Sequence, residues 1–393
     1  MKVVSVYNRY LNRGGEDEVF ESEAGLLRQH GIEVSLVTEQ VRSPASFRDK
    51  AAAALRATWS AQWYKEFQSL LESQRPDLVH VHNLVPTISP SVLYACSRVH
   101  VPVVHTLHNY RLFCPTSTFF RDGHLCEDCL QGTLWQGVKH GCYRDSRLAT
   151  AALATMLGVH RGLGTWNKKV DCFVVLTQFA RKKFMDGGLP GDRIVIKPNF
   201  VDPDPGRGKG DGDCCVFVGR LAAQKGISTL LSAWERLPKT VKLSVVGNGP
   251  LEAEVENASR SSQLSYLGRL SRSQTLEVIK RARFMVFPSE WYEGFPLTIT
   301  EAFACGVPVI CSRLGAMQEI VEDGRTGLHF TPGDADDLAA KVEWAWTHAA
   351  EMRAMGEAAR SEFEAKYTAQ RNYEMLFEIY QQTLHKRAGA VNN

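Results

Sequence analysis

The sequence has no long hydrophobic run. Nowhere among its 393 residues do about 18 apolar residues follow one another, the length that predicts a membrane-spanning helix. No cleavable apolar segment stands at the beginning of the chain, where residues 2–7 already read as a strand. No cluster of Lys and Arg is interleaved with aromatic residues, as in proteins that bind nucleic acid. We therefore expect no membrane span, no signal peptide and no nucleic-acid partner, and we predict a cytoplasmic protein.

The chain also lacks a strong net charge, since the formal value is +3. Residues 1–200 nevertheless contain 24 Lys and Arg against 18 Asp and Glu, whereas residues 201–393 contain 22 against 25. A basic first half could attract an anionic membrane or a lipid-linked acceptor, and a meaningless spread of surface charge is the alternative. The apolar stretch 148–159 is too short to span a bilayer, and we expect a buried helix there rather than one at the membrane interface.

Cysteine, by contrast, occurs ten times, and we expect reduced thiols in a cytoplasmic protein. Four cysteines fall in a polar segment, at about residues 113–145, that we expect to be an insertion. They are Cys114, Cys126, Cys129 and Cys142. A C-x2-C pair with one cysteine on either side suits tetrahedral zinc, and His124 or His140 could replace a thiol. We predict a structural zinc that adds folding energy, with four unligated thiols or a redox pair at Cys126 and Cys129 as alternatives.

Buried strands alternate with helices in both halves of the sequence. In the first half the expected strands fall at 2–7, 33–38, 78–82 and 103–107. Such alternation is typical of a parallel sheet covered by helices on both faces. A second series begins with a strand at 214–218, after residues 198–210, which are rich in Pro, Gly and charge and read as a linker. The fold class is therefore α/β, with two doubly wound parallel-sheet domains.

The most informative stretch is 287–308, FPSEWYEGFPLTITEAFACGVP. It reads as a strand end, a loop with acids and aromatics, and a helix from about Leu297 that a Gly and a Pro stop. We expect Glu293 at the helix mouth, where free N–H groups favour an anion, and Glu301 about one turn inside. Together they predict a crevice for a ligand rich in hydroxyls and phosphate. The alternative is an ordinary helix start with favourable surface acids.

Two cations follow the first strand of the second domain, in the sequence VFVGRLAAQKG. Arg220 comes directly after Gly219, and Lys225 stands five residues later. Cations at the carboxyl end of a parallel strand suit a diphosphate, and a solvated turn is the alternative.

The first domain offers weaker candidates. Gly14 and Gly15 lie between its first strand and first helix, where glycine lets backbone N–H groups approach a phosphate. The spacing is not G-x-G-x-x-G, so we expect no dinucleotide cofactor. His108 follows a buried strand, where a histidine can donate to a sugar hydroxyl or a developing charge, and a structural histidine is the alternative. His80 and His82 are less favoured.

The motifs resemble those of one enzyme family. Glu293 and Glu301, with seven residues between them, resemble the E-x7-E signature of retaining glycosyltransferases of family 4, the "glycosyl transferases group 1". The G-R-L-x-x-x-K-G pattern from Gly219 and the continuation CGVPVICSRLGAMQEIVEDGRTGLHFTPGD are similar to the same family. The resemblance covers nearly the whole chain. The family usually has His-Asp where this chain has His108 and Asn109, which puts a carboxylate role there in question.

The resemblance implies the GT-B architecture, in which two Rossmann-like domains face each other across a cleft. It implies an acceptor-side domain at 1–200, a nucleotide-sugar donor domain at 211–368, and a last helix at 369–387 that crosses back to the first domain.

It also implies roles for single residues. Arg220 and Lys225 would hold the donor diphosphate, Glu293 would lie by the donor sugar, and Glu301 would hold the ribose. His108 is kept as a sugar or acceptor contact. The other expected substrate contacts are Gly14, Gly15, Gly219, Asn248, Arg269, Gly294, Phe295, Pro296 and Leu297.

We therefore expect a retaining glycosyltransferase that moves a sugar from a nucleoside diphosphate-sugar to a glycan or lipid-linked acceptor, in cell-surface polysaccharide synthesis. In the front-face mechanism that the family favours, the leaving phosphate takes the acceptor's proton, so no protein base is needed. No D-x-D metal motif lies near the candidate donor site, and we expect no catalytic cofactor. Peripheral contact with the inner face of an anionic membrane is part of this expectation. The alternatives are a nucleotide-sugar epimerase or hydrolase of the same fold, and a non-catalytic sugar-binding protein.

Overall fold

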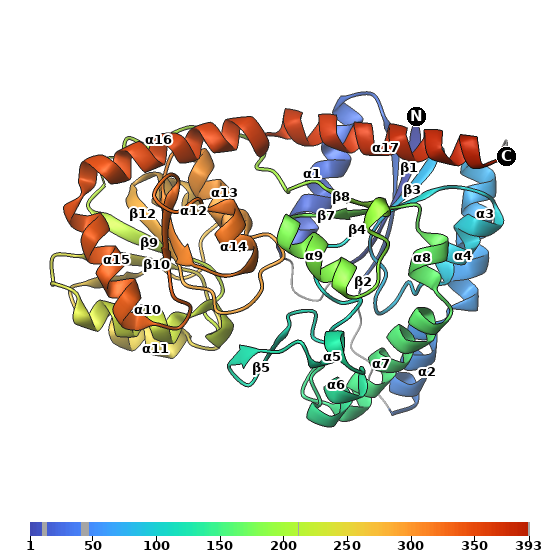
Figure 1. The fold of residues 1–393 in the computed structure, drawn as a ribbon, viewed down its shortest axis with the longest axis horizontal. Helices are drawn as coiled ribbons and strands as arrows, with labels where there is room; N and C mark the ends of the chain where they lie inside the picture. Colours follow the sequence, from blue (N-terminus) through green and yellow to red (C-terminus); the bar gives the residue numbers. More distant parts are fainter. Residues whose placement is uncertain (10–13, 41–46, 211, 392–393) are drawn as a thin grey trace. The chain divides into compact units, whose positions relative to one another are not determined.

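The structure is a computed structural model that describes residues 1–9, 14–40, 47–210 and 212–391 (Figure 1). The chain divides into two compact units. The first comprises residues 1–119, 126–198 and 372–393, and the second comprises residues 120–125 and 199–371. Each unit is built around its own six-stranded sheet.

The sheet of the first unit has the strand order β2-β1-β3-β4-β7-β8, and every neighbouring pair is parallel. Its strands are β1 (Lys2–Arg9), β2 (Glu33–Gln40), β3 (Leu78–Asn83), β4 (Val103–Thr106), β7 (Cys172–Val175) and β8 (Ile194–Ile196). All of β3 is buried, because a parallel sheet carries helices on both faces and its central strands meet no water.

The helices of the first unit pack on this sheet or extend from it. They are α1 (Gly15–Gln29), α2 (Phe47–Thr58), α3 (Ala61–Gln74), α4 (Ser91–Arg98), α5 (Asp128–Gln131), α6 (Trp135–His140), α7 (Arg147–Gly162), α8 (Thr165–Lys169), α9 (Gln178–Asp186), the 3-10 turn η1 (Gly191–Arg193) and most of α17 (Ala369–Val391). Leu27 of α1 and Leu376 and Tyr380 of α17 share one core with the strands, so these two helices cover the same face. The last helix therefore belongs to the core of the first unit from residue 372 onward.

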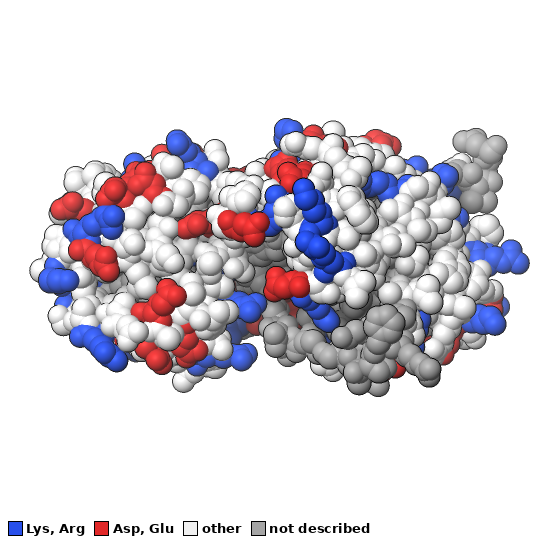
Figure 2. Space-filling view, turned by 90° about the horizontal axis from the view of Figure 1, so that it is seen from below, with Lys and Arg blue, Asp and Glu red and all other residues white. Residues whose placement is uncertain are grey.

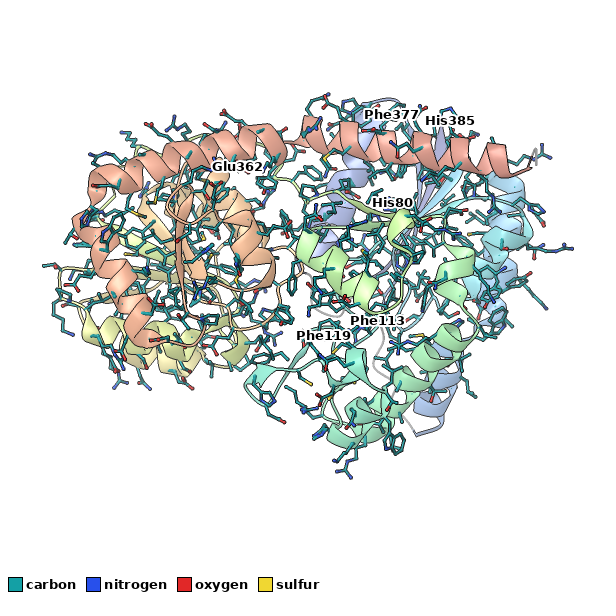
Figure 3. The ribbon with its side chains drawn as sticks, in the orientation of Figure 1. His80, Phe113, Phe119, Glu362, Phe377 and His385 are labelled. Carbon is teal, nitrogen blue, oxygen red and sulfur yellow. The ribbon has the colours of Figure 1, made fainter. Side chains whose placement is uncertain are left out.

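The expected insertion is irregular. It contains the short strands β5 (Phe120–Arg121) and β6 (His124–Leu125), which form an antiparallel hairpin, and the short helices α5 and α6. Phe113 and Phe119 of this segment, labelled in Figure 3, are buried. The insertion therefore has a few apolar anchors and little regular structure of its own.

The sheet of the second unit has the order β11-β10-β9-β12-β13-β14, again parallel throughout. Its strands are β9 (Cys214–Val218), β10 (Lys242–Val246), β11 (Leu264–Tyr266), β12 (Ala282–Phe287), β13 (Val309–Ser312) and β14 (Gly327–Phe330). The sequence did not lead us to expect β14. The first strand in sequence lies in the centre, which is the order of a Rossmann sheet.

Helices cover both faces of the second sheet. They are α10 (Ile227–Arg236), α11 (Glu252–Ala258), α12 (Arg272–Lys280), α13 (Leu297–Ala304), α14 (Gly315–Ile320), α15 (Ala335–Thr347) and α16 (Ala349–Lys366), with the 3-10 turn η2 (Ala223–Lys225). Residues of α10 and α15 form one core with the sheet, and residues of α13 and α14 form another. Each face of the sheet therefore has a core of its own.

The segment that reads as a linker is mostly attached to the second unit. Val201 N donates to Tyr367 O at 3.0 Å, Gly208 N donates to Cys305 O at 2.8 Å, and Asp204 pairs with Arg360. Pro and Gly in residues 198–210 thus shape a docked segment, and the chain passes between the units close to residues 198 and 371 and on either side of residues 120–125.

No helix among the described residues is long and apolar enough to cross a membrane. The stretch 148–159 forms part of α7, where Leu153, Met156 and Leu157 are buried but Leu148 is 75% exposed. The expected burial therefore holds for one face of the helix. On the face of the molecule drawn in Figure 2, Lys and Arg side chains are interspersed with Asp and Glu side chains.

Gly226 offers a test of the second unit's packing. Its φ is +71°, and a Cβ added there would lie 1.9 Å from Pro288 O. Gly206 is a matched control, because its φ is +74° and an added Cβ meets nothing within 4 Å. We expect Gly206→Ala to cost about 1–2 kcal/mol for the left-handed backbone alone, and Gly226→Ala to cost clearly more. Thermal unfolding midpoints measure the difference; an equal loss in both variants would contradict the close approach.

Candidate active site

Strand topology brings the two main motifs of the second unit together. The carboxyl ends of parallel strands lie at one edge of a sheet, and ligands bind where the strand order reverses. In this sheet the reversal falls between the neighbours β9 and β12. Lys225 follows β9 and Glu293 follows β12, and these residues are in contact although 68 positions separate them.

Glu293 is held by three donors. Its Oε1 accepts hydrogen bonds from Lys225 Nζ at 2.6 Å, Ser289 Oγ at 2.6 Å and Trp291 Nε1 at 2.7 Å. The residue is only 6% exposed. Its Oε2 has no hydrogen-bond partner among the described residues, so one oxygen fixes the carboxylate while the other is available to a ligand. The sequence argument gave this carboxylate to the N–H groups of α13; the structure instead pairs it with Lys225, Ser289 and Trp291.

Further contacts join the loops that follow β9 and β12. Glu290 N donates to Gln224 O at 2.9 Å, and Ser289 Oγ lies 3.2 Å from the same carbonyl oxygen. Thr229 Oγ1 donates to Glu290 Oε1 at 2.6 Å. Glu290, to which the sequence assigned no role, therefore anchors one loop on the other and helps to hold Glu293 in place.

Arg220 differs from Lys225. Its side chain is exposed, and it forms no ion pair with any residue that the structure describes. The Lys225 side chain is only 19% exposed, and it already pairs with Glu293. The cation at position 220 is therefore free for an anionic ligand, whereas the one at 225 shares its charge with a carboxylate.

Glu301 lies in α13, one turn after the helix begins at Leu297, as the sequence predicts. Arg272 Nε donates to Glu301 Oε1 at 3.1 Å, and Arg272 Nη1 donates to Asp202 O at 2.7 Å. No sequence motif pointed to Arg272. The cap residue of α13 is Pro296, which offers no side-chain acceptor, so the first N–H groups of the helix receive no side-chain cap. Gly294, Phe295 and Leu297 are partly exposed at this end of the helix.

The loops after β10 and β11 carry the remaining expected contacts. Asn248 and Arg269 are both exposed. A Cβ at Gly247, where φ is +139°, would lie 1.8 Å from Gly219 O, so only glycine allows this approach of two loops. Gly219, Asn248 and Arg269 thus lie in loops at the same edge of the sheet as Arg220.

In the first unit the glycine pair is poorly suited to phosphate. Gly14 N donates to Asp17 Oδ2 at 2.9 Å, so this N–H group is already used. The first turn of α1 contains Glu16, Asp17 and Glu18, and their charges oppose an anion at the helix start. This acidic turn speaks against the phosphate contact expected of Gly14 and Gly15. The four residues before Gly14 in the same motif lie outside the described residues.

Asn109, which stands where the family motif has an aspartate, contacts a carboxylate from another element. Asn109 Nδ2 donates to Glu16 Oε1 at 2.6 Å. Glu16 therefore brings an acid next to the position where the family motif has one. Sequence reasoning missed this residue because 93 positions separate the two partners.

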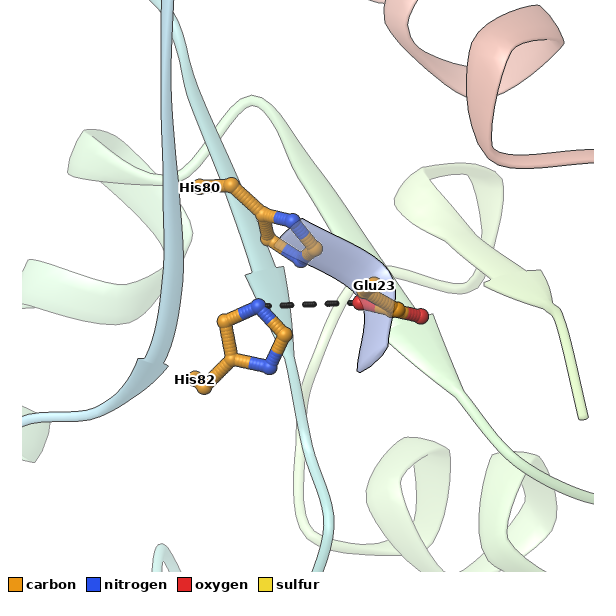
Figure 4. A group of neighbouring side chains, drawn as sticks. All are labelled: Glu23, His80 and His82. Atoms are coloured by element: carbon orange, nitrogen blue, oxygen red, sulfur yellow. Dashed lines mark ion pairs between the residues drawn. The ribbon is translucent and has the colours of Figure 1, made fainter. Parts of the chain in front are cut away.

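His108 is 7% exposed and belongs to a layer of buried polar groups. His82 Nδ1 lies 3.0 Å from His108 Nε2, and His82 Nε2 lies 3.7 Å from Glu23 Oε2 (Figure 4). His80 lies in the interior of the first unit beside α17, as Figure 3 shows, and its Nδ1 is 2.7 Å from Tyr380 Oη. Its Nε2 is 2.7 Å from Thr106 Oγ1.

The atoms of Glu23, His80 and His82 lie within 4.8 Å of one another, a spacing that could hold a metal ion. Two observations disfavour a metal there. Lys197 Nζ forms an ion pair with Glu23 Oε1, so an ammonium already supplies the positive charge. Both ring nitrogens of His80 are engaged with hydroxyl groups. We therefore interpret the group as buried polar side chains that are partnered by Lys197, Thr106, Tyr380 and His108.

The four cysteines of the insertion are neighbours. Burial, followed by the nearby Cys114, Cys142 and Cys126 thiols, raises the pKa of Cys129 to about 11. Within the described part of the chain, no three of these sulfur atoms all lie within 4.8 Å of one another, as the ligand atoms of the Glu23 group do. His124 and His140, the possible substitutes, are exposed.

Comparison with known proteins identifies the family. The model for Glycosyltransferase Family 4 matches residues 14–205, and the model for Glycosyl transferases group 1 matches residues 204–362. The chain belongs to this glycosyltransferase family. It is therefore a glycosyltransferase, as the E-x7-E and G-R-L-x-x-x-K-G patterns indicated.

Relatives and solved structures agree with this assignment. An uncharacterized glycosyltransferase of Methanocaldococcus jannaschii is 27% identical over 71% of this chain and 68% of its own length. The sulfoquinovosyl transferase of Arabidopsis thaliana is 24% identical over 88% of this chain and 66% of its own length. Sucrose-phosphate synthase from Thermosynechococcus elongatus superposes with a TM-score of 0.73 at 17% identity, over 98% of this chain and 99% of its own. The fold is GT-B.

The Lys225–Glu293 pair can be tested without a substrate. Lys225→Met leaves a buried carboxylate without its ammonium, and we expect a loss of about 1–3 kcal/mol in stability. Adding Glu293→Gln should recover part of that loss, because the uncompensated charge is then removed. Arg220→Met is the control, and it should change stability by no more than about 0.5 kcal/mol. Unfolding midpoints that are additive for the double variant would show that the pair is not coupled.

Proposed function

We propose that this glycosyltransferase is a retaining enzyme that moves a sugar from a nucleoside diphosphate-sugar to a glycan or lipid-linked acceptor. The observation that carries the proposal is the arrangement at the β9–β12 reversal, where the loop after β9 carries the exposed Arg220 and also Lys225, which pairs with Glu293 from the loop after β12. Solved neighbours support the donor class, because the Anabaena protein HepE was crystallised with UDP and with UDP-glucose.

A role in cell-surface polysaccharide synthesis is the finer part of the proposal. O-antigen chain mannosyltransferase B of Escherichia coli is 31% identical over 38% of this chain, and it covers 42% of that protein's length. The name of this relative supports a growing polysaccharide as the acceptor. We further propose that the enzyme works in the cytoplasm, with peripheral contact at the inner face of an anionic membrane. The basic composition of residues 1–200 supports that contact.

The chemistry of the second unit suits departure of a diphosphate. As the bond to the sugar breaks, negative charge grows on the leaving oxygen, and Arg220 and Lys225 offset it. The acceptor hydroxyl attacks the same face of the sugar that the diphosphate leaves, and the leaving phosphate takes the hydroxyl proton. Glu293 Oε2 is placed to accept a hydrogen bond from a sugar hydroxyl. No base from the protein and no metal ion are needed for this sequence of steps.

The start of α13 completes the donor site in this proposal. Its uncapped N–H groups, next to Gly294, Phe295 and Pro296, suit a phosphate oxygen. Glu301 would accept hydrogen bonds from the ribose hydroxyls. Its pairing with Arg272 orients the carboxylate for that contact.

The alternative with the same fold is a nucleotide-sugar epimerase or hydrolase, which would release free nucleoside diphosphate without an acceptor. A non-catalytic sugar-binding protein would need no unpaired cation at position 220. The reaction products therefore separate these alternatives from the proposed transferase.

The test is an assay with UDP-, GDP- and other sugar donors and with extracted glycolipids, with and without chelator. We expect transfer to depend on the acceptor, to persist in chelator, and to keep the anomeric configuration when the product is examined by NMR. Arg220→Ala should lower turnover by about 10²–10³-fold while donor affinity changes less, since the charge that it meets grows in the transition state. Release of nucleoside diphosphate without any acceptor dependence would favour the hydrolase.

We also propose that Cys114, Cys126, Cys129 and Cys142 bind one structural zinc. Their mutual influence on the Cys129 thiol and the scarcity of regular structure around them support the proposal. Metal analysis of protein purified without chelator should find close to one zinc per chain. Cys126→Ser with Cys129→Ser should lose it, whereas Cys96→Ser, at a buried cysteine of α4, should retain it. Protein that is free of metal and has an ordered insertion would refute the site.

A further inference from the structure

A line of buried polar groups connects a charged pair to His108 in the first unit. Lys197, after β8, pairs with Glu23 Oε1 of α1. Glu23 Oε2 lies 3.7 Å from His82 Nε2, and His82 Nδ1 lies 3.0 Å from His108 Nε2. Lys197 is 0% exposed and Glu23 is 1% exposed. Water therefore cannot replace any of these contacts, and each atom's role is set by its neighbours.

The histidines in this line are neutral. Burial and then the Lys197 charge lower the pKa of His82 to about 3. Burial also holds the pKa of His108 well below its ordinary value, with His82 as the next cause. A neutral imidazole carries one proton, so each ring has one donor nitrogen and one acceptor nitrogen. The question is which nitrogen of each ring holds the proton.

The Glu23 carboxylate decides this for His82. If the proton were on Nδ1, the lone pair of Nε2 would face the negative Oε2. These two buried atoms would then repel each other. With the proton on Nε2, an N–H group meets the carboxylate instead. Both atoms otherwise have no hydrogen-bond partner among the described residues. His82 Nδ1 is then an acceptor.

The same logic passes to His108. Because His82 Nδ1 accepts, the hydrogen bond of 3.0 Å requires a proton on His108 Nε2. His108 Nδ1 is then left with its lone pair. This nitrogen has no hydrogen-bond partner among the described residues and, unlike His82 Nε2, is not one of the fully buried atoms that lack one.

We propose that Glu23, acting through His82, fixes His108 in the tautomer with its proton on Nε2, so that His108 Nδ1 is a hydrogen-bond acceptor for a hydroxyl group of the sugar or acceptor. Glu23 and His82 are positioning residues in this arrangement. The identity of the ligand rests on the proposed function, but the tautomer does not. The sequence led us to keep His108 as a sugar or acceptor contact, and this tautomer gives that contact a direction.

Other charged and titratable groups near His108 are consistent with a neutral ring. They come from every element packed against it: His82 from β3, Glu23 from α1, His105 from β4 and Lys197 after β8. His80 and Tyr380 extend the network toward α17. Of these groups only Glu23 favours a charged His108, and its carboxylate is already paired with Lys197.

The first test uses the wild-type protein. Selective labelling with ¹⁵N-histidine and long-range proton–nitrogen NMR distinguish an imidazole N–H from a bare nitrogen, and His82→Asn and His108→Asn variants assign the signals. We expect both His82 and His108 to carry the proton on Nε2. Neither ring should titrate between pH 6 and pH 8, a range in which an ordinary histidine changes its charge. A proton on His108 Nδ1, or a His108 that titrates in this range, would overturn the proposal.

The second test replaces the acceptor at position 23 with a donor. In Glu23→Gln the amide oxygen keeps the contact with Lys197, so the amide N–H group faces His82 Nε2. That nitrogen must now accept, and the proton of each histidine moves to Nδ1. Glu21→Gln is the matched control, because Glu21 lies on the same helix and pairs with Arg9 at 2.8 Å. The control should leave both tautomers unchanged, and unchanged tautomers in Glu23→Gln would contradict control by the carboxylate.

Activity provides a separate reading. With a donor that the panel assay identifies, Glu23→Gln should lower turnover at least tenfold and leave affinity for the bare nucleoside diphosphate within twofold. Glu23→Asp, which keeps the carboxylate, should retain more of the turnover. If wild type transfers no sugar from any donor, the proposed function fails while the NMR result still stands. If transfer occurs but the wild-type tautomer is the other one, this inference alone fails.

Discussion

The site depends on one geometric constraint, namely that the strands of each sheet are parallel. Their carboxyl ends then lie at one edge, and a crevice for a ligand forms where the strand order reverses. In the second unit that point lies between β9 and β12, and the pair of Lys225 and Glu293 is the contact that results. The close approach of Gly226 to Pro288 and the bond from Thr229 to Glu290 keep the two loops together. The residues with chemistry are therefore held by backbone as much as by side chains.

The first unit, in contrast, contains a buried ion pair. Taking Lys197 and Glu23 out of water costs several kcal/mol per charge, and their attraction repays this only if the remaining atoms find partners. Lys197 meets Glu23 Oε1, and the second carboxylate oxygen meets His82. The imidazole layer thus completes the pairing of a buried charge. Its histidines stay neutral, and the Glu23 carboxylate determines their tautomers.

The sequence predicted the fold well and the site in part. Alternating buried strands and helices gave the two parallel sheets, and α13 begins at Leu297 as expected. Local pattern could not reveal partners distant in sequence, such as Arg272 beside Glu301 or Glu16 beside Asn109. The roles of Arg220, Lys225 and the expected substrate contacts stay predictions. Composition alone did not distinguish a free linker from a docked segment, because the Pro and Gly residues of the expected linker shape a segment that docks on the second unit.

The two units also differ in the ligand chemistry that they favour. The second unit presents Arg220 without an ion pair, and a diphosphate needs such a cation. The first unit has an acidic turn at the start of α1, which repels phosphate, and a neutral His108. A neutral acceptor nitrogen suits a hydroxyl group and gives little binding energy to an anion. Under the proposed function, this contrast favours binding of the donor diphosphate by the second unit, because the first unit offers it no free cation at these positions and suits an uncharged hydroxyl group instead.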